Sequence, residues 1–325
     1  MDSSNFSIFS SNRHSLQIFV KMFETKKQFS ACPICNKEDI ATLLHTKDYS
    51  LTQEDFQIIQ CAHCTLEYTD PVPAKDQIAP YYNFPSYISH TDTKEGIVNK
   101  MYHKVRNYTL TQKTNWIQSL FTGHKGNILE IGAGTGAFAD AMTKKGWKVT
   151  ALEPDATSRQ KAMEKYNIAL LPIENLNELP PSQYEIITLW HVLEHVHELE
   201  AYMKAFHNLL KPNGRLVIAV PNYTSYDAQF YKKYWAAYDV PRHLYHFSPL
   251  AMHYLAKKYK MSIVQKIPMW FDSFYVSLLS EKYKKTGFLG MIRAFLVGCI
   301  SNLKALQNAD RGSSIIYEIR KNQVL

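Results

Sequence analysis

The 325-residue sequence lacks several features that would define its class directly. No N-terminal segment combines a charged start, an apolar centre and a small-residue cleavage site, so we expect no secretory signal and a cytoplasmic location. No apolar run reaches the roughly 18 uninterrupted residues that a membrane span requires. The most apolar late stretch, residues 287–300, is interrupted by Arg293. This predicts a buried or pocket-lining helix and no membrane span, with peripheral contact to a membrane surface as the alternative.

Long basic runs and internal repeats are also missing. The formal net charge is +8, and the excess is spread along the chain. A solvated surface explains this pattern better than a nucleic-acid footprint does. Residues 1–25, which contain many Ser and Asn, are predicted to be a disordered leader. The length of the chain favours one large domain with a small second module.

Cysteine is scarce, with five in the chain, but four of them form two C-x-x-C pairs. The pairs are Cys32 with Cys35 and Cys61 with Cys64. Two such turns can direct four thiolates at one point, which is the tetrahedral arrangement that zinc prefers. A closed thiolate shell leaves no position for water, so we predict a structural zinc ribbon over residues 28–72. The segment between the pairs is net acidic, which disfavours contact with phosphate.

From about residue 125 the sequence alternates short apolar runs with amphipathic stretches. Strands are predicted near 127–131, 147–152, 168–171, 184–190, 214–220, 261–267 and 314–320, and helices near 136–146, 155–166, 197–210 and 248–260. This order implies an α/β fold with a doubly wound, seven-stranded, mainly parallel, Rossmann-like sheet. Residues 73–124 are expected to form a linker and helical lid. Residues 125–325 are expected to form the large domain, with a helical insertion at about 270–311.

A glycine-rich segment, GAGTGA at residues 132–137, follows the first predicted strand of the large domain. It satisfies the G-x-G-x-x-G/A pattern of dinucleotide sites, so a dehydrogenase is one alternative. Glu130 lies two residues before the first glycine, and Glu153 ends the second strand. A carboxylate at Glu130 would repel a pyrophosphate and attract an ammonium or sulfonium group, whereas Glu153 suits ribose hydroxyls. The segment therefore favours S-adenosylmethionine (SAM) as the ligand.

Four segments resemble, in order and spacing, those of class I SAM-dependent methyltransferases: ILEIGAGTGAF, VTALEPD, YEIITLWHVLEHV and LLKPNGRLVIAVPN. The resemblance implies a set of cofactor-binding residues, which are Glu130, Gly132, Ala133, Gly134, Gly136, Glu153, Pro154, Ile173, Glu174, Trp190 and His191. The zinc ribbon and the segment DVPRHLYHFSP (239–249) resemble a bacterial subgroup of these enzymes. That subgroup implies a small-molecule, sugar or lipid-linked acceptor.

Methyl transfer requires alignment of acceptor and donor and, where the acceptor is protonated, a base. Histidine can accept a proton at neutral pH, and we predict His243 first and His191 second as the base. The segment HVLEH also matches a zinc-protease pattern, but its place after a buried strand argues against a protease. A divalent cation held by His191, Glu194 and His195 is a further alternative, because comparable segments suggest one in some quinone-type O-methyltransferases.

Aromatic side chains in the expected site loops suit a sulfonium. Those available are Tyr81, Tyr82, Tyr87 and Trp190, and His90 and His246 lie in the same loops. The sequence thus predicts a SAM-dependent methyltransferase acting on oxygen, carbon or nitrogen. RNA methylation and a non-catalytic SAM-binding protein are the alternatives, and the oligomeric state stays open.

Overall fold

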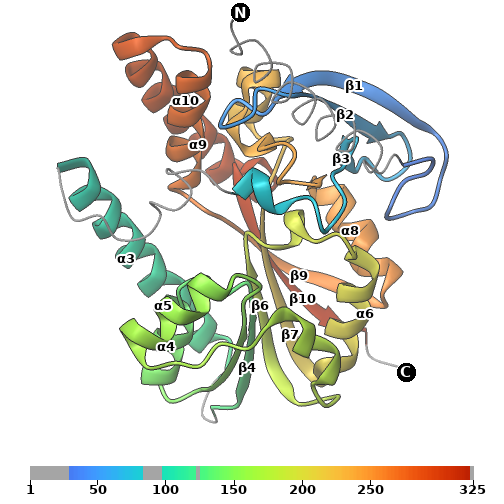
Figure 1. The fold of residues 1–325 in the computed structure, drawn as a ribbon, viewed down its shortest axis with the longest axis vertical. Coiled ribbons are helices and arrows are strands. Elements are labelled where there is room, and N and C mark those ends of the chain that lie inside the picture. The colour runs from blue at the N-terminus through green and yellow to red at the C-terminus, as the bar shows by residue number, and fades with distance from the viewer. Residues whose placement is uncertain (1–28, 83–96, 122–124, 323–325) are drawn as a thin grey trace, which may run out of the picture.

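The computed structural model describes residues 29–82, 97–121 and 125–322, which contain a large central sheet and a small sheet (Figure 1). The central sheet has six strands in the order β5-β4-β6-β7-β10-β9. Their bounds are β4 (Asn127–Ile131), β5 (Lys148–Leu152), β6 (Tyr184–Trp190), β7 (Leu210–Pro221), β9 (Met261–Pro268) and β10 (Ser314–Lys321). Strands β4 to β7 are parallel to one another, and β10 runs antiparallel to both of its neighbours.

This arrangement confirms the predicted doubly wound, mainly parallel α/β fold. The strand predicted near 168–171 is reduced to one bridge between Leu171 and Leu152, so the described sheet has six strands rather than seven. Pro172 follows directly, and the chain then enters the short 3-10 helix η2 (Ile173–Glu178). Because proline has no N–H to donate, it cannot continue a strand ladder at this point.

Helices cover both faces of the central sheet. They are α3 (Ile97–Ser119), α4 (Ala137–Lys144), α5 (Ala156–Tyr166), α6 (Leu199–Leu209) and α8 (Pro249–Lys258). Successive side chains of a strand point to opposite faces, and the two apolar cores follow this rule. Ile128 packs in one core with Met142 of α4, whereas Leu129 packs in the other with Met203 of α6 and Leu255 of α8.

The small sheet combines N-terminal strands with a strand from the large domain. Its order is β1 (Ile40–Lys47), β2 (Asp55–Cys61), β3 (Glu67–Asp70) and β8 (Tyr245–His246). In the last pair, Glu67 is opposite His246 and Tyr68 is opposite Tyr245. The segment 239–249 is therefore attached to the cysteine-rich module by backbone pairing, an arrangement that sequence spacing did not indicate.

Two further helices, α9 (Asp272–Tyr283) and α10 (Gly287–Gln307), pack against each other and against α7 (Tyr226–Tyr231). Figure 1 shows them and the small sheet beyond the same end of the central sheet. Short 3-10 helices complete the described elements: η1 (Ala79–Tyr82), η3 (Leu193–His195), η4 (Lys232–Tyr234), η5 (Ala236–Tyr238) and η6 (Ala309–Arg311).

Helix α10 differs from its predicted character. By length and composition it is the one described helix that could cross a membrane, yet only 33% of its apolar window is buried. The expectation of a buried or pocket-lining helix is thus wrong for one of its faces, which carries exposed Phe288, Leu289 and Phe295.

Candidate functional site

The glycine loop after β4 exposes its backbone at the carboxyl edge of the sheet. Gly132 and Gly134 have positive φ values of 68° and 54°, which favour glycine. A Cβ at Gly132 would lie 2.4 Å from Cγ2 of Val192, whereas a Cβ at Gly134 would meet no atom within 4 Å. The N–H groups of Gly132 and Ala133 donate to the Leu152 carbonyl at 2.8 and 3.0 Å. The loop is thus tied to β5 and leaves open space above Gly134.

Glu153 directly follows β5 and faces this loop. Its carboxylate accepts from the N–H groups of Gly134 at 2.8 Å and Asp155 at 3.0 Å. Asp155 in turn caps α5 by accepting from the N–H groups of Thr157 and Ser158, so the cap fixes the turn that carries Glu153. Burial raises the pKa of Glu153. A buried carboxylate here can accept hydrogen bonds from a pair of hydroxyl groups above Gly134.

Glu130 and Trp190 form an environment that selects a cation. Glu130 is 2% exposed, and its Oε2 has no hydrogen-bond partner. Burial raises the pKa of Glu130 to about 8, although the Lys113 ammonium opposes that shift. Nζ of Lys113 lies 4.4 Å from the centroid of the Trp190 ring, so this aromatic face already accepts a positive charge. Burial lowers the pKa of Lys113, whereas Asp272 and Glu130 raise it.

His191 follows Trp190 in a left-handed turn with φ of 58°. Its Nδ1 lies 3.3 Å from Glu194 Oε1, and its Nε2 lies 3.1 Å from Asp272 Oδ2 at the start of α9. Burial alone would lower the pKa of His191, but hydrogen bonds to Asp272 and Glu194 raise it to about 9. A protonated imidazole has no lone pair to accept a proton. This geometry therefore argues against the predicted role of His191 as a base.

His195 and His243 form a pair beside Glu194. Their ring centroids are 4.6 Å apart in an edge-on arrangement. Nδ1 of His243 lies 2.8 Å from the Ala237 carbonyl, and Nδ1 of His195 lies 3.0 Å from the Arg242 carbonyl. Since a carbonyl only accepts, each Nδ1 is the donor, so in the neutral form of each ring Nε2 is the nitrogen that carries the lone pair. Burial and His243 lower the pKa of His195 to about 4, so this ring is neutral at pH 7.

The two histidines and Glu194 fit a divalent cation. Glu194 is fully buried, and its Oε2 has no partner. One ligand atom from each of Glu194, His195 and His243 lies within 4.8 Å of the others. Metal-bound histidines commonly donate their second ring nitrogen to a carbonyl, as both do here. The sequence hypothesis named His191 in place of His243, whereas in the structure His191 bonds the other oxygen of Glu194 and Asp272.

Arg242 holds the segment that carries His243. It is 1% exposed and donates to Asp48 of the small module, to Asp239 and to the Tyr81 carbonyl. Burial would raise the pKa of Asp48 and Asp239, but Arg242 holds both below the usual value. Thr69 Oγ1 also donates to the His243 carbonyl at 2.6 Å. The sequence did not indicate this role of Arg242, although the segment 239–249 contains it.

The other predicted residues of this region either follow β5 or contact the histidine pair. Ile173 and Glu174 begin η2, half-buried and exposed respectively, beside the end of β5. Pro154 is exposed after Glu153. Tyr82 Oη lies 3.0 Å from His195 Nδ1, which places Tyr82 at the site.

The remaining candidates fall outside this site. Tyr81 is buried in a core with Phe56 and bonds Glu54, so it packs rather than lines the site. His246 is also buried, with its Nε2 3.1 Å from Thr69 Oγ1. Tyr87 and His90 lie outside the described residues.

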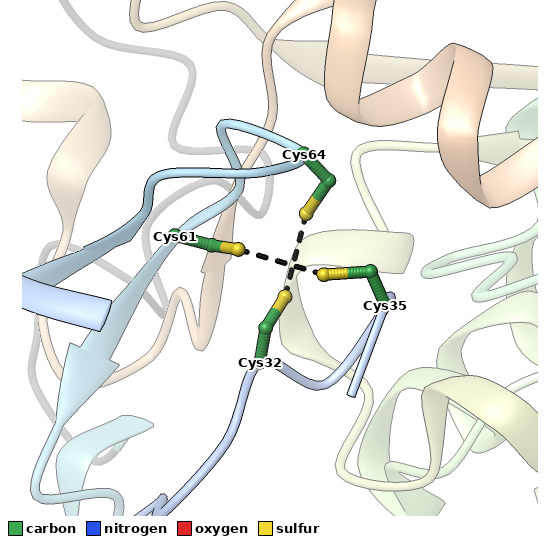
Figure 2. Close-up of side chains that lie close together, drawn as sticks. All are labelled: Cys32, Cys35, Cys61 and Cys64. Atoms are coloured by element: carbon green, nitrogen blue, oxygen red, sulfur yellow. Dashed lines mark hydrogen bonds between the residues drawn. The ribbon is translucent and has the colours of Figure 1, made fainter. Parts of the chain in front are cut away.

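The four paired cysteines come together in the small module, as Figure 2 shows. Sγ of Cys32 lies 3.4 Å from that of Cys64, and Sγ of Cys35 lies 3.5 Å from that of Cys61. These separations exceed a disulfide bond of about 2.05 Å. They approach the edge of about 3.8 Å of a tetrahedron with zinc–sulfur bonds of about 2.3 Å. The cluster is therefore compatible with a structural zinc ion.

The strand order, the bare glycine loop and the buried acid after the second strand together define a class I SAM-dependent methyltransferase. Residues 102–266, just over half of the chain, match the family model described as a methyltransferase domain. The chain therefore belongs to this family, whose cosubstrate is SAM.

The chain is similar to two curated ubiquinone biosynthesis O-methyltransferases. With that of Pseudomonas aeruginosa it shares 28% identity over 117 residues, covering 34% of this chain and 50% of the relative. With that of Acinetobacter baumannii it shares 28% over 119 residues, with the same coverage. The chain thus spans about half the length of the curated relatives it matches.

Among solved structures, it is similar to magnesium protoporphyrin IX methyltransferase from Synechocystis PCC 6803 with bound S-adenosylhomocysteine (SAH). That pair has 14% identity, a TM-score of 0.48, and coverage of 75% of this chain and 98% of the other. It is also similar to 1,6-didemethyltoxoflavin-N1-methyltransferase from Burkholderia thailandensis, with 16% identity and a TM-score of 0.44. That match covers 81% of this chain and 97% of the other.

Proposed function

We propose that the protein transfers the methyl group of SAM to an oxygen atom of a small-molecule acceptor. The observation that carries this proposal is the His195–His243 pair beside the buried Glu194, next to a subsite that selects a cation. A proton acceptor next to a methyl-donor subsite is what transfer to a hydroxyl requires. The curated relatives named as O-methyltransferases support oxygen as the acceptor atom.

In this proposal the cofactor lies across the carboxyl ends of β4, β5 and β6. Glu153 binds the ribose hydroxyls above Gly134, and the ionised Glu130 binds the ammonium of the methionine end. The sulfonium takes the place of the Lys113 ammonium over the Trp190 ring. Ile173 would contact the adenine, because η2 begins beside the end of β5.

His243 is the proposed base. Its Nε2 accepts the proton of the acceptor hydroxyl while the oxygen attacks the methyl carbon. The S–CH₃ bond breaks, the O–CH₃ bond forms, and the sulfur keeps the electron pair as neutral SAH. His191 lowers the pKa of Glu194 against the effect of burial, so Glu194 is ionised and stabilises the positive charge that develops on His243.

A divalent cation held by Glu194, His195 and His243 is a second candidate for the same step. The buried Oε2 of Glu194, which has no partner, favours it. When bound, such an ion would lower the pKa of an acceptor hydroxyl by direct contact, and His243 would then be a ligand instead of a base.

The test uses labelled SAM with small-molecule extract fractions and, separately, with cellular RNA. We expect a labelled small molecule, and His243→Ala should reduce its formation by roughly 10²- to 10⁴-fold with SAH binding unchanged. His253→Ala, on the exposed surface of α8, is the matched control. If EDTA abolishes turnover and magnesium restores it, the mechanism with a bound divalent cation replaces the mechanism in which His243 is the base. Labelled RNA alone, or SAH binding without any product, would refute the proposal.

A further inference from the structure

The outward face of α10 is covered by large apolar side chains. Six of them recur at helical spacing and are 54–75% exposed, namely Phe288, Leu289, Phe295, Leu296, Leu303 and Leu306. Soluble proteins rarely leave a contiguous patch of this kind open to water. We therefore expect another surface to cover this face of α10.

Small residues on the opposite face determine which way α10 points. Gly290, Ala294, Gly298, Ser301 and Ala305 are its buried positions against the protein, together with Val297. A Cβ at Gly298 would lie 2.5 Å from the Phe274 ring of α9, so the two helices pack closely there. Because small residues make the protein contact, the large apolar side chains are directed away from it.

The apolar surface continues along α9 toward the methyl-transfer site. Tyr275 and Leu278 of α9 are 43% and 45% exposed, and Phe271, which precedes α9, is 40% exposed. The next residue, Asp272, bonds Nε2 of His191 at 3.1 Å. One end of the exposed face is therefore adjacent to the candidate site.

The charges of this hairpin complement an anionic surface. Residues 270–307 contain five basic and two acidic side chains. Both acidic side chains have internal partners, since Asp272 bonds His191 and Glu281 bonds Arg293 at 2.5 Å. Lys282 and Lys285 are exposed at the turn that leads into Phe288. A second copy of the hairpin would bring like charges together, which disfavours a dimer through this face.

We propose that the α9–α10 face docks on the surface of an anionic lipid bilayer. The apolar side chains insert among the acyl chains near the headgroups, and the lysines contact anionic headgroups. A spanning arrangement fits less well, because Ser301 of α10 donates to the fully buried Asp227 at 2.6 Å and Arg293 pairs with Glu281. This docking brings the candidate site to the membrane. If the proposed function holds, the substrate class is then a lipid-soluble acceptor.

The test is flotation of the full chain with vesicles of phosphatidylcholine alone or mixed with phosphatidylglycerol. The wild type should bind the mixed vesicles. The double variant Leu289→Glu, Leu296→Glu should bind them about tenfold or more weakly. The variant Lys282→Glu, Lys285→Glu should lose the preference for anionic lipid. Met163→Glu, a similarly exposed position on α5, is the matched control and should bind as the wild type does.

SAH-induced thermal stabilisation of each variant shows that it is folded and keeps the proposed function separate from docking. The proposal would be overturned if the wild type bound neither kind of vesicle. It would also be overturned if the double variant Leu289→Glu, Leu296→Glu bound as the wild type does. A concentration-dependent dimer that the same double variant abolishes in sedimentation would assign the face to a second copy. Vesicle binding without SAH binding would reject the function and retain the docking surface.

Discussion

Replacing Glu130 by glutamine tests whether this carboxylate recognises the cationic end of the cofactor. Burial raises the Glu130 pKa to about 8 against the opposing effect of Lys113, so about one molecule in ten carries the carboxylate at pH 7. An ammonium binds the carboxylate in preference to the neutral acid, and binding therefore lowers this pKa and releases a proton. Ionising Glu130 at pH 7 costs about 1.4 kcal/mol of binding free energy.

The ionisation of Glu130 determines the sign and size of the pH dependence of SAH affinity. The affinity for SAH, which keeps the ammonium, should rise about tenfold per pH unit below pH 8 and level off above it. At about pH 8.5, Glu130→Gln should weaken binding roughly ten- to a hundredfold, because a hydrogen bond to a charged group contributes about 1.5–3 kcal/mol. Near pH 6 the two proteins should differ by a few-fold at most, since wild-type Glu130 is then protonated.

Calorimetry in buffers of different ionisation enthalpy measures both the affinity and the proton release. Glu153, whose pKa burial also raises, adds a dependence of the same sign. Only the part that Glu130→Gln removes belongs to Glu130, and Glu164→Gln, on the exposed surface of α5, serves as the control. An unchanged pH profile in Glu130→Gln would refute the electrostatic argument for SAM at this loop.

The same pKa predicts an effect on folding. A folded Glu130 keeps a proton that the unfolded chain releases near its ordinary pKa of 4.5. The free energy of unfolding should therefore fall as the pH rises from about 4.5 to about 8, and Glu130→Gln should remove part of that decline. Urea denaturation across this pH range measures it.

Three other substitutions test other contacts of the structure. Arg242→Met leaves the buried Asp48 and the half-buried Asp239 without their cation, so it should lower the free energy of unfolding by about 3–5 kcal/mol in urea titrations. Lys47→Met, which breaks an exposed ion pair, should change it by less than about 1 kcal/mol. Cys35→Ser should reduce metal content below the one zinc per chain expected by mass spectrometry and lower the melting temperature, whereas Cys299→Ser should do neither. In the Glu130→Gln background, where Lys113 no longer affects the ionisation of Glu130, Lys113→Met should tighten SAM binding several-fold because it removes a competing cation from the Trp190 face. Weaker binding would mean that this ammonium does not occupy the sulfonium position.

The parts of the site that could be predicted from the sequence are those set by local spacing. Glu130 lies near the end of β4, the glycines and Glu153 follow their strands directly, and parallel strands bring their carboxyl ends to one edge. Asp272 and Lys113 could not be placed, because they reach the site from helices whose docking depends on tertiary packing. The contact of Arg242 with Asp48 spans 194 residues, and no periodicity indicates it.

Helix α10 illustrates a different limit of sequence reasoning. Its hydropathy predicted burial because apolar side chains usually avoid water. The helix buries its small residues instead and exposes its large ones. Composition therefore identified an apolar helix correctly, whereas the packing of α9 and α7 decided which face it shows to solvent.

The small module contacts the segment that carries His243. Strand β3 pairs with β8, Thr69 Oγ1 donates to the His243 carbonyl, and Asp48 binds Arg242 in the same segment. Each contact restrains the backbone on one side of the His243 imidazole, and the Ala237 carbonyl restrains the ring itself. Loss of zinc should therefore act on catalysis by loosening His243, with turnover falling more than SAH affinity. Equal losses of turnover and SAH affinity would instead indicate general unfolding.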